Sequence, residues 1–256
     1  MTPTSLGRDP ARWTVSLPFL IAAMGLLVAI LLSLWAEPKV ARRAAAERVA
    51  AAALEVDRDV QAVDERLRSI NGVVVRLSID VAAVALRWTQ EDLGAVFRRR
   101  ARPRFAGMLG PVAQQFNYRR DAGAWVRSSA QADDSLSAIY GAGLVALDGV
   151  RALADSAVPR IWMIARDGGE VTYAPFDSGY FFDNVGDNDY RGSDWLEQTR
   201  PGVGEAGEAR WLPPFFAEAE ARWLTSSATA LMVRGEWWGS VGVDVDVGIL
   251  VGSGGH

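Results

Sequence analysis

The chain has 256 residues, of which 50% are hydrophobic and 23% charged, so it is neither disordered nor collagen-like and can form a packed core. It has no cysteine and a single histidine, His256, which excludes disulfides, thiolate nucleophiles, Cys/His zinc sites and a Ser-His-Asp triad. The formal net charge of −4 argues against general binding to nucleic acid, and no nucleic-acid partner is expected.

The first predicted element is a transmembrane helix over residues 13–36. This run carries no charged residue, and about 20 residues are needed to cross a bilayer as a helix. Trp13 and Trp35 bracket the run as interfacial aromatic residues do, and Pro18 lies in its first turns, where a missing N–H matters least. The alternative, a cleaved signal peptide, has a shorter apolar stretch that ends at small residues. We therefore expect a retained anchor.

The orientation of this span is predicted from the residues on either side of it. Four basic residues follow the span closely and two precede it, so a literal positive-inside count places the N-terminus outside. The rule is weak for long domains, however, and 220 residues follow this span. We therefore expect residues 1–12 to be a short cytoplasmic tail. The chain would then be a single-pass protein of the inner (plasma) membrane with an extracytoplasmic, periplasmic body.

Residues 37–101 are predicted to form one long amphipathic helix, called the stalk below. Twelve apolar positions alternate at steps of four and three residues, with charged residues between them, as in a coiled coil. These seam positions are Val49, Ala53, Val56, Val60, Val63, Leu67, Ile70, Val74, Leu77, Val81, Val84 and Trp88. Their β-branched row is typical of a parallel two-stranded coil, so a homodimer through the stalk is expected. The alternative is a helix that packs on its own domain.

Two features of the sequence complicate the prediction of one continuous stalk helix. Asn71-Gly72 weakens the pattern and predicts a kink, and the apolar residues beyond it lie on more than one side, so the upper half is expected to pack against the body as well. Five arginines lie between Arg98 and Arg104. They are interpreted as a solvated helix end that stops at Pro103, with contact to nucleic acid or anionic lipid as the alternative.

Residues 102–256 are predicted to form the body, in which helices precede an antiparallel sheet, so the fold class is α+β. A helix is expected from about 134 to 155, starting at Asp133-Asp134-Ser135. Turn residues between strand-like runs predict hairpins. Their turns are Asp121-Ala122-Gly123, Asp167-Gly168-Gly169 and Arg234-Gly235-Glu236.

This order of elements resembles the Cache domain, a PAS-like extracytoplasmic sensor domain of bacterial transmembrane receptors, here of the double-Cache type and its first subdomain. The resemblance covers roughly residues 37–251. Its most specific part is the closing hairpin, where Gly239 to Asp244 match the family's glycine-spaced apolar strand that ends in Asp. The resemblance implies a small-molecule pocket between the sheet and the segment carrying Trp195, and a shift of the long helix when ligand binds.

The resemblance also bears on the ligand. In Cache sensors that bind amino acids, an Arg two positions before the Trp holds the carboxylate, and Tyr and Asp residues hold the amine. This chain keeps only Trp195 and Asp244 of that pattern. The Arg, two Tyr and downstream Asp of the family are replaced by Ser193, Leu196, Phe215 and Ala217. The departure implies a ligand other than a standard amino acid.

The residues themselves predict a similar site. Aromatic residues concentrate between and beside the predicted strands, which indicates an apolar pocket, although each could simply belong to the core. Asp244 and Asp246 lie two apart on an apolar strand, so both carboxylates face one side and need a cation, a hydrogen-bond donor or water. The predicted ligand-binding residues are Tyr180, Tyr190, Trp195, Trp211, Phe215, Asp244 and Asp246.

No metal site and no cofactor are expected. Asp187, Asp189 and Gly192 match positions of an EF-hand loop, but Arg191 and Gln198 stand where calcium needs oxygen ligands. The sequence has no GxSxG, phosphate-loop, dinucleotide-binding or HExxH motif, so no catalysis and no catalytic residue are expected in this chain. Any output enzyme would lie in a downstream region.

The sequence therefore predicts the membrane-anchored extracytoplasmic ligand-sensing domain of a bacterial signal-transduction receptor. The receptor would be of the sensor kinase, phosphatase or chemoreceptor type, and binding of a small molecule would be coupled to movement of the stalk helix. The alternative is a non-catalytic, membrane-anchored dimeric scaffold protein without a ligand.

Overall fold

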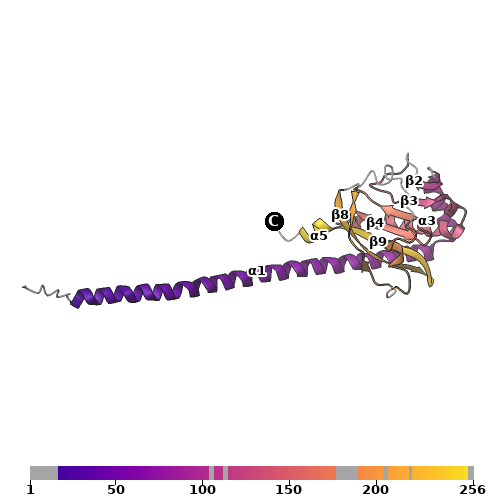
Figure 1. Ribbon diagram of the computed structural model, residues 1–256. Helices are drawn as coiled ribbons and strands as arrows, with labels where there is room; N and C mark the ends of the chain where they lie inside the picture. Colours follow the sequence, from indigo (N-terminus) through magenta and orange to yellow (C-terminus); the bar gives the residue numbers. More distant parts are fainter. Residues whose placement is uncertain are drawn as a thin grey trace, which may run out of the picture. The chain divides into compact units, whose positions relative to one another are not determined.

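The computed structural model describes residues 17–103, 107–111, 115–176, 190–203, 207–218 and 221–252, with side chains described except at 17–23, 34–38 and 251. It forms two compact units, Met1–Val60 and Gln61–His256. The helix α1 (Leu17–Arg87) begins in the first unit and ends in the second (Figure 1).

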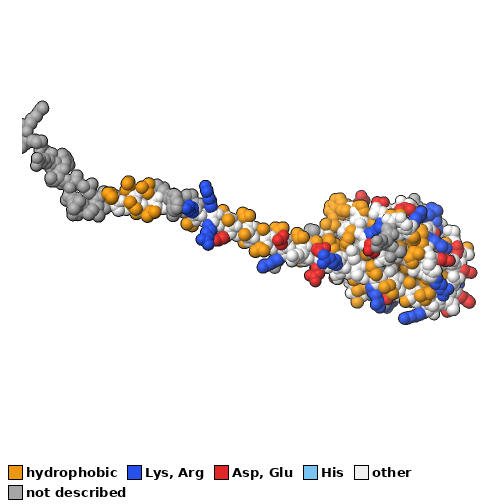
Figure 2. Space-filling view, turned by 90° about the horizontal axis from the view of Figure 1, so that it is seen from below, with side chains coloured by type: hydrophobic (Ala, Val, Ile, Leu, Met, Phe, Trp, Pro, Cys, Tyr) orange, Lys and Arg blue, Asp and Glu red, His pale blue; other side chains and the backbone are white. Residues whose placement is uncertain are grey.

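The first unit contains the N-terminal part of α1. Within the predicted span, Met24–Ser33 is an apolar helical segment whose large side chains are about half to two-thirds exposed, and hydrophobic side chains run along it in Figure 2. Residues 13–16 lie outside the described residues. Among the described residues, one stretch, Lys39–Arg87, is long enough to cross a membrane and contains an 18-residue window with a mean hydropathy of 1.6. Of its most apolar 18-residue window, 28% is buried, and Val74 and Leu77 are among the residues that pack in the main core.

The predicted single helix over 37–101 is interrupted. The helix α1 continues through Asn71-Gly72 and ends at Arg87, and α2 (Gln90–Arg100) follows. Thr89 causes the break because its extended backbone and its side chain, which accepts a hydrogen bond from Asp92 N at 3.1 Å, cap the start of a new helix. Glu91 and Asp92 lie in the first turn of α2, where their negative charges interact favourably with the positive end of the helix dipole.

In the described part of the second unit, nine strands form one sheet whose pairings are all antiparallel. The strands are β1 (Ala101–Pro103), β2 (Met108–Pro111), β3 (Gly123–Arg127), β4 (Arg160–Ala165), β5 (Glu170–Tyr173), β6 (Arg210–Trp211), β7 (Phe215–Ala217), β8 (Arg222–Val233) and β9 (Glu236–Asp246). Their order is β1-β2-β3-β5-β4-β9-β8-β6, and β7 also pairs with β8. The remaining helices are α3 (Asp134–Gly149), α4 (Asp194–Glu197), α5 (Val247–Gly252) and two 3-10 turns, Ser128–Gln131 and Arg151–Leu153. The predicted α+β class, a PAS-like antiparallel sheet with flanking helices, is confirmed.

Two of the three predicted hairpins are confirmed, β4-β5 and β8-β9. The β8-β9 turn has positive φ at Arg234 (53°) and Gly235 (81°), which is the backbone of a type I′ turn. The hairpin predicted around Asp121 is wrong, because β3 pairs with β2 and β5. The preceding residues instead form a turn, in which Asn117 O accepts from Asp121 N at 2.7 Å and the Asp121 carboxylate accepts from Asn117 N at 2.9 Å.

The helix predicted over 134–155 is confirmed but ends earlier, at Gly149. Asp133 caps its start, where its carboxylate accepts from Leu136 N at 3.0 Å. After Gly149 the chain leaves helical geometry at Val150 and makes a single 3-10 turn.

The sheet has two different faces. On β4, Ile161, Met163 and Ala165 pack into the main core with α3, α2 and the last turns of α1. The alternate residues, including Trp162 and Ile164, pack on the opposite face against α4. As predicted, the upper half of the stalk packs against the body: Ile70, Val74, Leu77 and Val81 belong to the main core. The face of the sheet opposite the main core can therefore carry a binding site.

Candidate ligand-binding site

The face of the sheet opposite the main core carries a cavity of about 100 Å³, called the Trp195 cavity below. It is lined by Arg160, Trp162, Ile164, Glu170, Tyr190, Trp195, Phe215 and Asp244. Arg160, Trp162 and Ile164 are alternate residues of β4, and alternate side chains of a strand point to the same side of the sheet. The floor of the cavity is therefore the sheet itself, and Tyr190, Trp195 and Phe215 form its walls.

A row of polar side chains crosses three neighbouring strands in this floor. Asp244 on β9 is paired in register with Arg160 on β4 and with Ser226 on β8. Asp244 is 3% exposed, and its carboxylate accepts from Ser226 Oγ at 2.7 Å, Trp162 Nε1 at 2.8 Å and Arg160 Nη1 at 3.3 Å. A buried carboxylate is stable only with such donors and an opposite charge. The Asp244 carboxylate is thus held in one position by donors from the two neighbouring strands.

Trp162 occupies the floor because a glycine faces it. Gly242 lies opposite Trp162 in the β4-β9 register, and a Cβ atom there would lie 2.4 Å from Cζ2 of the Trp162 ring. The missing side chain leaves room for the indole beside β9, where its Nε1 donates to Asp244.

The aromatic wall is connected to the same polar row. Trp195 lies in α4, and its Nε1 donates to Ser226 Oγ at 3.0 Å. Its ring makes edge-to-face contacts with two others. The distance between ring centroids and the angle between ring planes are 5.3 Å and 82° for Phe215, and 6.1 Å and 79° for Tyr190. Such edge contacts add to the burial of the rings and orient them. Ser226 therefore joins the wall to the charged floor.

The cavity combines charges of both signs with aromatic surface. Glu170 is 3% exposed, and the Arg160 side chain is 11% exposed. The lining thus has two carboxylates and one guanidinium among its described residues. Chemically, the carboxylates suit an ammonium group, the guanidinium suits a carboxylate, and the aromatic rings suit an apolar or cationic portion.

The structure brings four of the seven predicted residues to this cavity: Tyr190, Trp195, Phe215 and Asp244. Tyr180 lies outside the described residues. Trp211 does not line it; it pairs with Ser227 on β8 and packs on the main core, on the opposite face of the sheet.

Asp246 does not line the cavity either. Its carboxylate accepts from Arg222 Nη1 at 3.3 Å and from Ile249 N at 3.1 Å, which caps the start of α5. The repulsion expected between Asp244 and Asp246 is therefore relieved by a separate arginine for each carboxylate.

Sequence reasoning missed Arg160, Trp162, Ile164 and Glu170. The signal was present in the first hairpin, since β4 alternates residues between the two faces and Arg160 is the one charged residue in a strand that is otherwise apolar.

Comparisons with known proteins find similarity only among solved structures. Neither a scan against family models nor a search of curated proteins finds a match. Among solved structures, the sensory domain of the Campylobacter jejuni chemoreceptor Tlp3 with isoleucine bound matches at 9% identity and a TM-score of 0.31, covering 74% of this chain and 64% of that one.

Two further structures match. The ligand-binding domain of the Pseudomonas fluorescens chemoreceptor CtaA, in complex with L-valine, matches at 14% identity and a TM-score of 0.30, covering 73% of this chain and 65% of that one. The ligand-binding domain of the Pseudomonas aeruginosa amino acid chemoreceptor PctC, in complex with GABA, matches at 14% identity and a TM-score of 0.28, covering 38% of this chain and 43% of that one. The chain spans less than two-thirds of each of these domains. In these matches it is similar to Cache-type sensory domains of bacterial chemoreceptors.

Proposed function

We propose that this chain is the sensor region of a membrane-anchored receptor and that the Trp195 cavity binds its small-molecule ligand. The observation that carries the proposal is the buried Asp244–Arg160 pair in the floor of a cavity walled by Tyr190, Trp195 and Phe215. A core without function has little use for buried charge, since replacing such a pair by apolar residues is often neutral or stabilising. Polar groups that converge in an aromatic cavity are typical of ligand sites.

The ligand proposed is a small molecule with an amino group. Two carboxylates in the lining, Glu170 and Asp244, provide the charge for it, and the neighbouring rings can hold a cation over their faces. The expectation of a ligand other than a standard amino acid is not kept. It rested on Ser193, Leu196, Phe215 and Ala217, which stand where the family has an Arg, two Tyr and an Asp, whereas Arg160 brings a guanidinium to the cavity from another strand. The similar domains of Tlp3 and CtaA were solved with isoleucine and valine bound.

A route from the cavity to the stalk passes through two adjacent residues of β8. Ser226 faces the cavity, where it contacts Trp195 and Asp244. Ser227 faces the opposite side, and its hydroxyl donates to Asn71 Oδ1 of α1 at 2.7 Å. A ligand that repositions Trp195 would therefore act on a strand that is hydrogen-bonded to the stalk helix. This supports the proposal that ligand binding is coupled to movement of the stalk.

Membrane attachment and dimerisation belong to the same proposal. Exposed apolar side chains over Met24–Ser33 are unfavourable in water and suit a bilayer, which supports an anchor in the first unit. The seam positions divide in two: Ile70, Val74, Leu77 and Val81 are used by the body, whereas Val49, Val56 and Val60 are 59–70% exposed. The exposed part is available to a second copy.

The test is thermal unfolding of the full chain in detergent, against pools of amino acids, amines, organic acids, purines and sugars. A ligand at about 100 times its dissociation constant adds about 2.7 kcal/mol, which for this size raises the midpoint by roughly 5–11 °C. We expect one pool to give a saturable rise. Trp195→Phe keeps an aromatic wall but loses the bond to Ser226, so it should weaken the response, whereas Trp223→Phe, an exposed tryptophan outside the cavity, should not.

The scaffold alternative predicts a different result. A well-folded chain that responds to no pool, with Trp195→Phe and Trp223→Phe both indistinguishable from wild type, would contradict the sensor proposal and favour a scaffold protein.

A further inference from the structure

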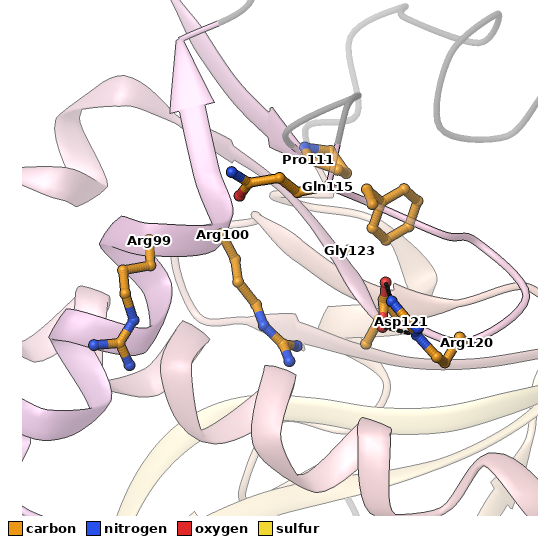
Figure 3. A pocket seen from close by; sticks show the side chains of 9 residues that line it. Arg99, Arg100, Pro111, Gln115, Arg120, Asp121 and Gly123 are labelled. Atoms are coloured by element: carbon orange, nitrogen blue, oxygen red, sulfur yellow. Dashed lines mark hydrogen bonds and ion pairs between the residues drawn. The ribbon is translucent and has the colours of Figure 1, made fainter.

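A second cavity, called the arginine cavity below, lies away from the first. It has a volume of about 290 Å³ and lies where the end of α2 meets β2 and the segment leading into β3 (Figure 3). Its lining consists of Arg99, Arg100, Pro111, Gln115, Phe116, Arg120, Asp121, Ala122 and Gly123. The two cavities share no lining residue.

The stretch of sequence that supplies the lining of the arginine cavity is rich in positive charge. Residues 98–127 contain eight arginines and one acidic residue, Asp121, in a chain whose formal net charge is −4. Such a local excess of one sign in an otherwise acidic protein creates a positive potential that attracts anions.

The acidic side chains nearby are already used. The Asp121 carboxylate accepts from Arg120 Nε at 3.1 Å and from Asn117 N at 2.9 Å. The Asp148 carboxylate pairs with Arg100 Nη2 at 2.6 Å and accepts from Ala122 N at 2.9 Å. Among the described residues no acidic side chain pairs with Arg99, so the lining retains an unbalanced positive charge.

A second observation comes from the guanidinium of Arg100. Within the described part of the chain, its Nη1 atom is buried and has no hydrogen-bond partner. A buried donor without an acceptor is costly, about 1–3 kcal/mol, although the Arg100 side chain as a whole is 39% exposed and its Nη2 atom pairs with Asp148. Figure 3 shows the Arg100 guanidinium between Arg99 on one side and the Arg120–Asp121 pair on the other.

We propose that the arginine cavity binds an oxyanion, the phosphate or carboxylate group of a small organic molecule. The oxygens would supply the negative charge that the exposed Arg99 lacks, and they would reach Arg100 Nη1 only after the Arg100 side chain, which is 39% exposed, turns toward the cavity. Phe116, Pro111 and Ala122 give the cavity an apolar side, and its volume leaves room for more than a bare ion. This site is independent of the amino-group ligand proposed for the Trp195 cavity.

The test uses the full chain in detergent with inorganic phosphate, and separately malonate, as probes. Each is compared with sodium chloride at the same ionic strength, and the thermal midpoint is followed as the probe is titrated. We expect a saturable rise of several degrees above the chloride reference. A response to phosphate alone identifies a phosphorylated ligand, and a response to malonate identifies a carboxylate; either supports the site.

Two matched variants decide whether the cavity or the general charge is responsible. Arg99→Gln removes a lining arginine that has no acidic partner among the described residues, and should raise the apparent dissociation constant at least tenfold. Arg102→Gln removes an exposed arginine of the same stretch that does not line the cavity, and should change it less than twofold. Trp195→Phe should leave the response unchanged. No saturable rise in the wild-type chain, or equal losses in Arg99→Gln and Arg102→Gln, would overturn the proposal.

Discussion

At the scale of single residues, the two aspartates of β9 show how position decides the role of the same side chain. Asp244 and Asp246 point to the same side of one strand, yet Asp244 is held in a cavity floor by three donors and Asp246 caps a helix. The period of two in the sequence correctly put them on one face. Their partners, Arg160 and Arg222, come from two other strands, so no local pattern could assign them.

Asp121 allows a quantitative prediction at this scale. Burial opposes ionisation of Asp121, but the hydrogen bonds from Arg120 and Asn117 and the nearby charge of Arg100 outweigh it and hold the pKa below the usual 3.8. Because the pKa is lower in the folded state, ionised Asp121 stabilises the fold well above pH 3.8, and this contribution is lost as the pH falls through the folded pKa.

Asp121→Asn should therefore lower the free energy of unfolding by about 0.5–1 kcal/mol at pH 7, a modest amount because the Arg120 side chain is largely exposed. Urea unfolding between pH 3 and 7 measures this difference, which should shrink toward the acid end. Glu236→Gln, which removes an exposed negative charge on β9, is the control and should show a smaller difference. An Asp121→Asn penalty that is the same at pH 3 and pH 7 would contradict the assignment.

At the scale of elements, local signals and long-range pairings behave differently. The β4-β5 and β8-β9 hairpins could be predicted because their turn residues lie between the strands they join. The neighbours of β3 could not, because β5 is far along the chain and the turn residues near Asp121 instead close a turn on Asn117. The division between α1 and α2 did have a local signal, the capping residue Thr89, which the continuous apolar seam concealed.

The packing of α3 on α2 gives a prediction at this scale. A Cβ atom at Gly141 would lie 2.0 Å from the backbone oxygen of Leu93, whereas one at Gly149 would meet nothing within 4 Å. Gly141→Ala should therefore force the two helices apart and lower the free energy of unfolding by about 1–3 kcal/mol or more. Gly149→Ala makes the same chemical change on the same helix without a clash.

Chemical denaturation of both variants measures the contrast. We expect Gly149→Ala to stay within about 0.5 kcal/mol of wild type or to gain slightly, since alanine favours helix over glycine. Equal effects from the two substitutions would mean that α2 and α3 do not approach each other as closely as the structure shows.

At the scale of the whole molecule, the stalk serves two purposes along one helix. The seam spacing continues from Val49 to Trp88, but Asn71-Gly72 interrupts its composition and the apolar residues beyond it lie on more than one side, so the sequence did indicate where packing on the body begins. The structure places that beginning near Ile70, since Val60 is exposed and Val74 is fully buried. A periodic apolar face specifies only that something covers it, and here different partners are expected for its two halves.

The proposed dimer is tested by the exposed half of the seam. A coiled coil places Val56 and Val60 at positions that face the partner helix, and Leu54, also exposed, at a position that faces away. The double variant Val56→Asp, Val60→Asp should bury like charges in the interface and convert the full chain in detergent from dimer to monomer, as measured by light scattering corrected for detergent mass. Leu54→Asp introduces an aspartate beside the same turn and should leave the dimer intact. Two results would contradict the proposed dimer: a wild-type chain that is monomeric over the whole concentration range, or a dimer that the double variant does not disrupt. Either would show that a second copy of the stalk does not cover this half of the seam.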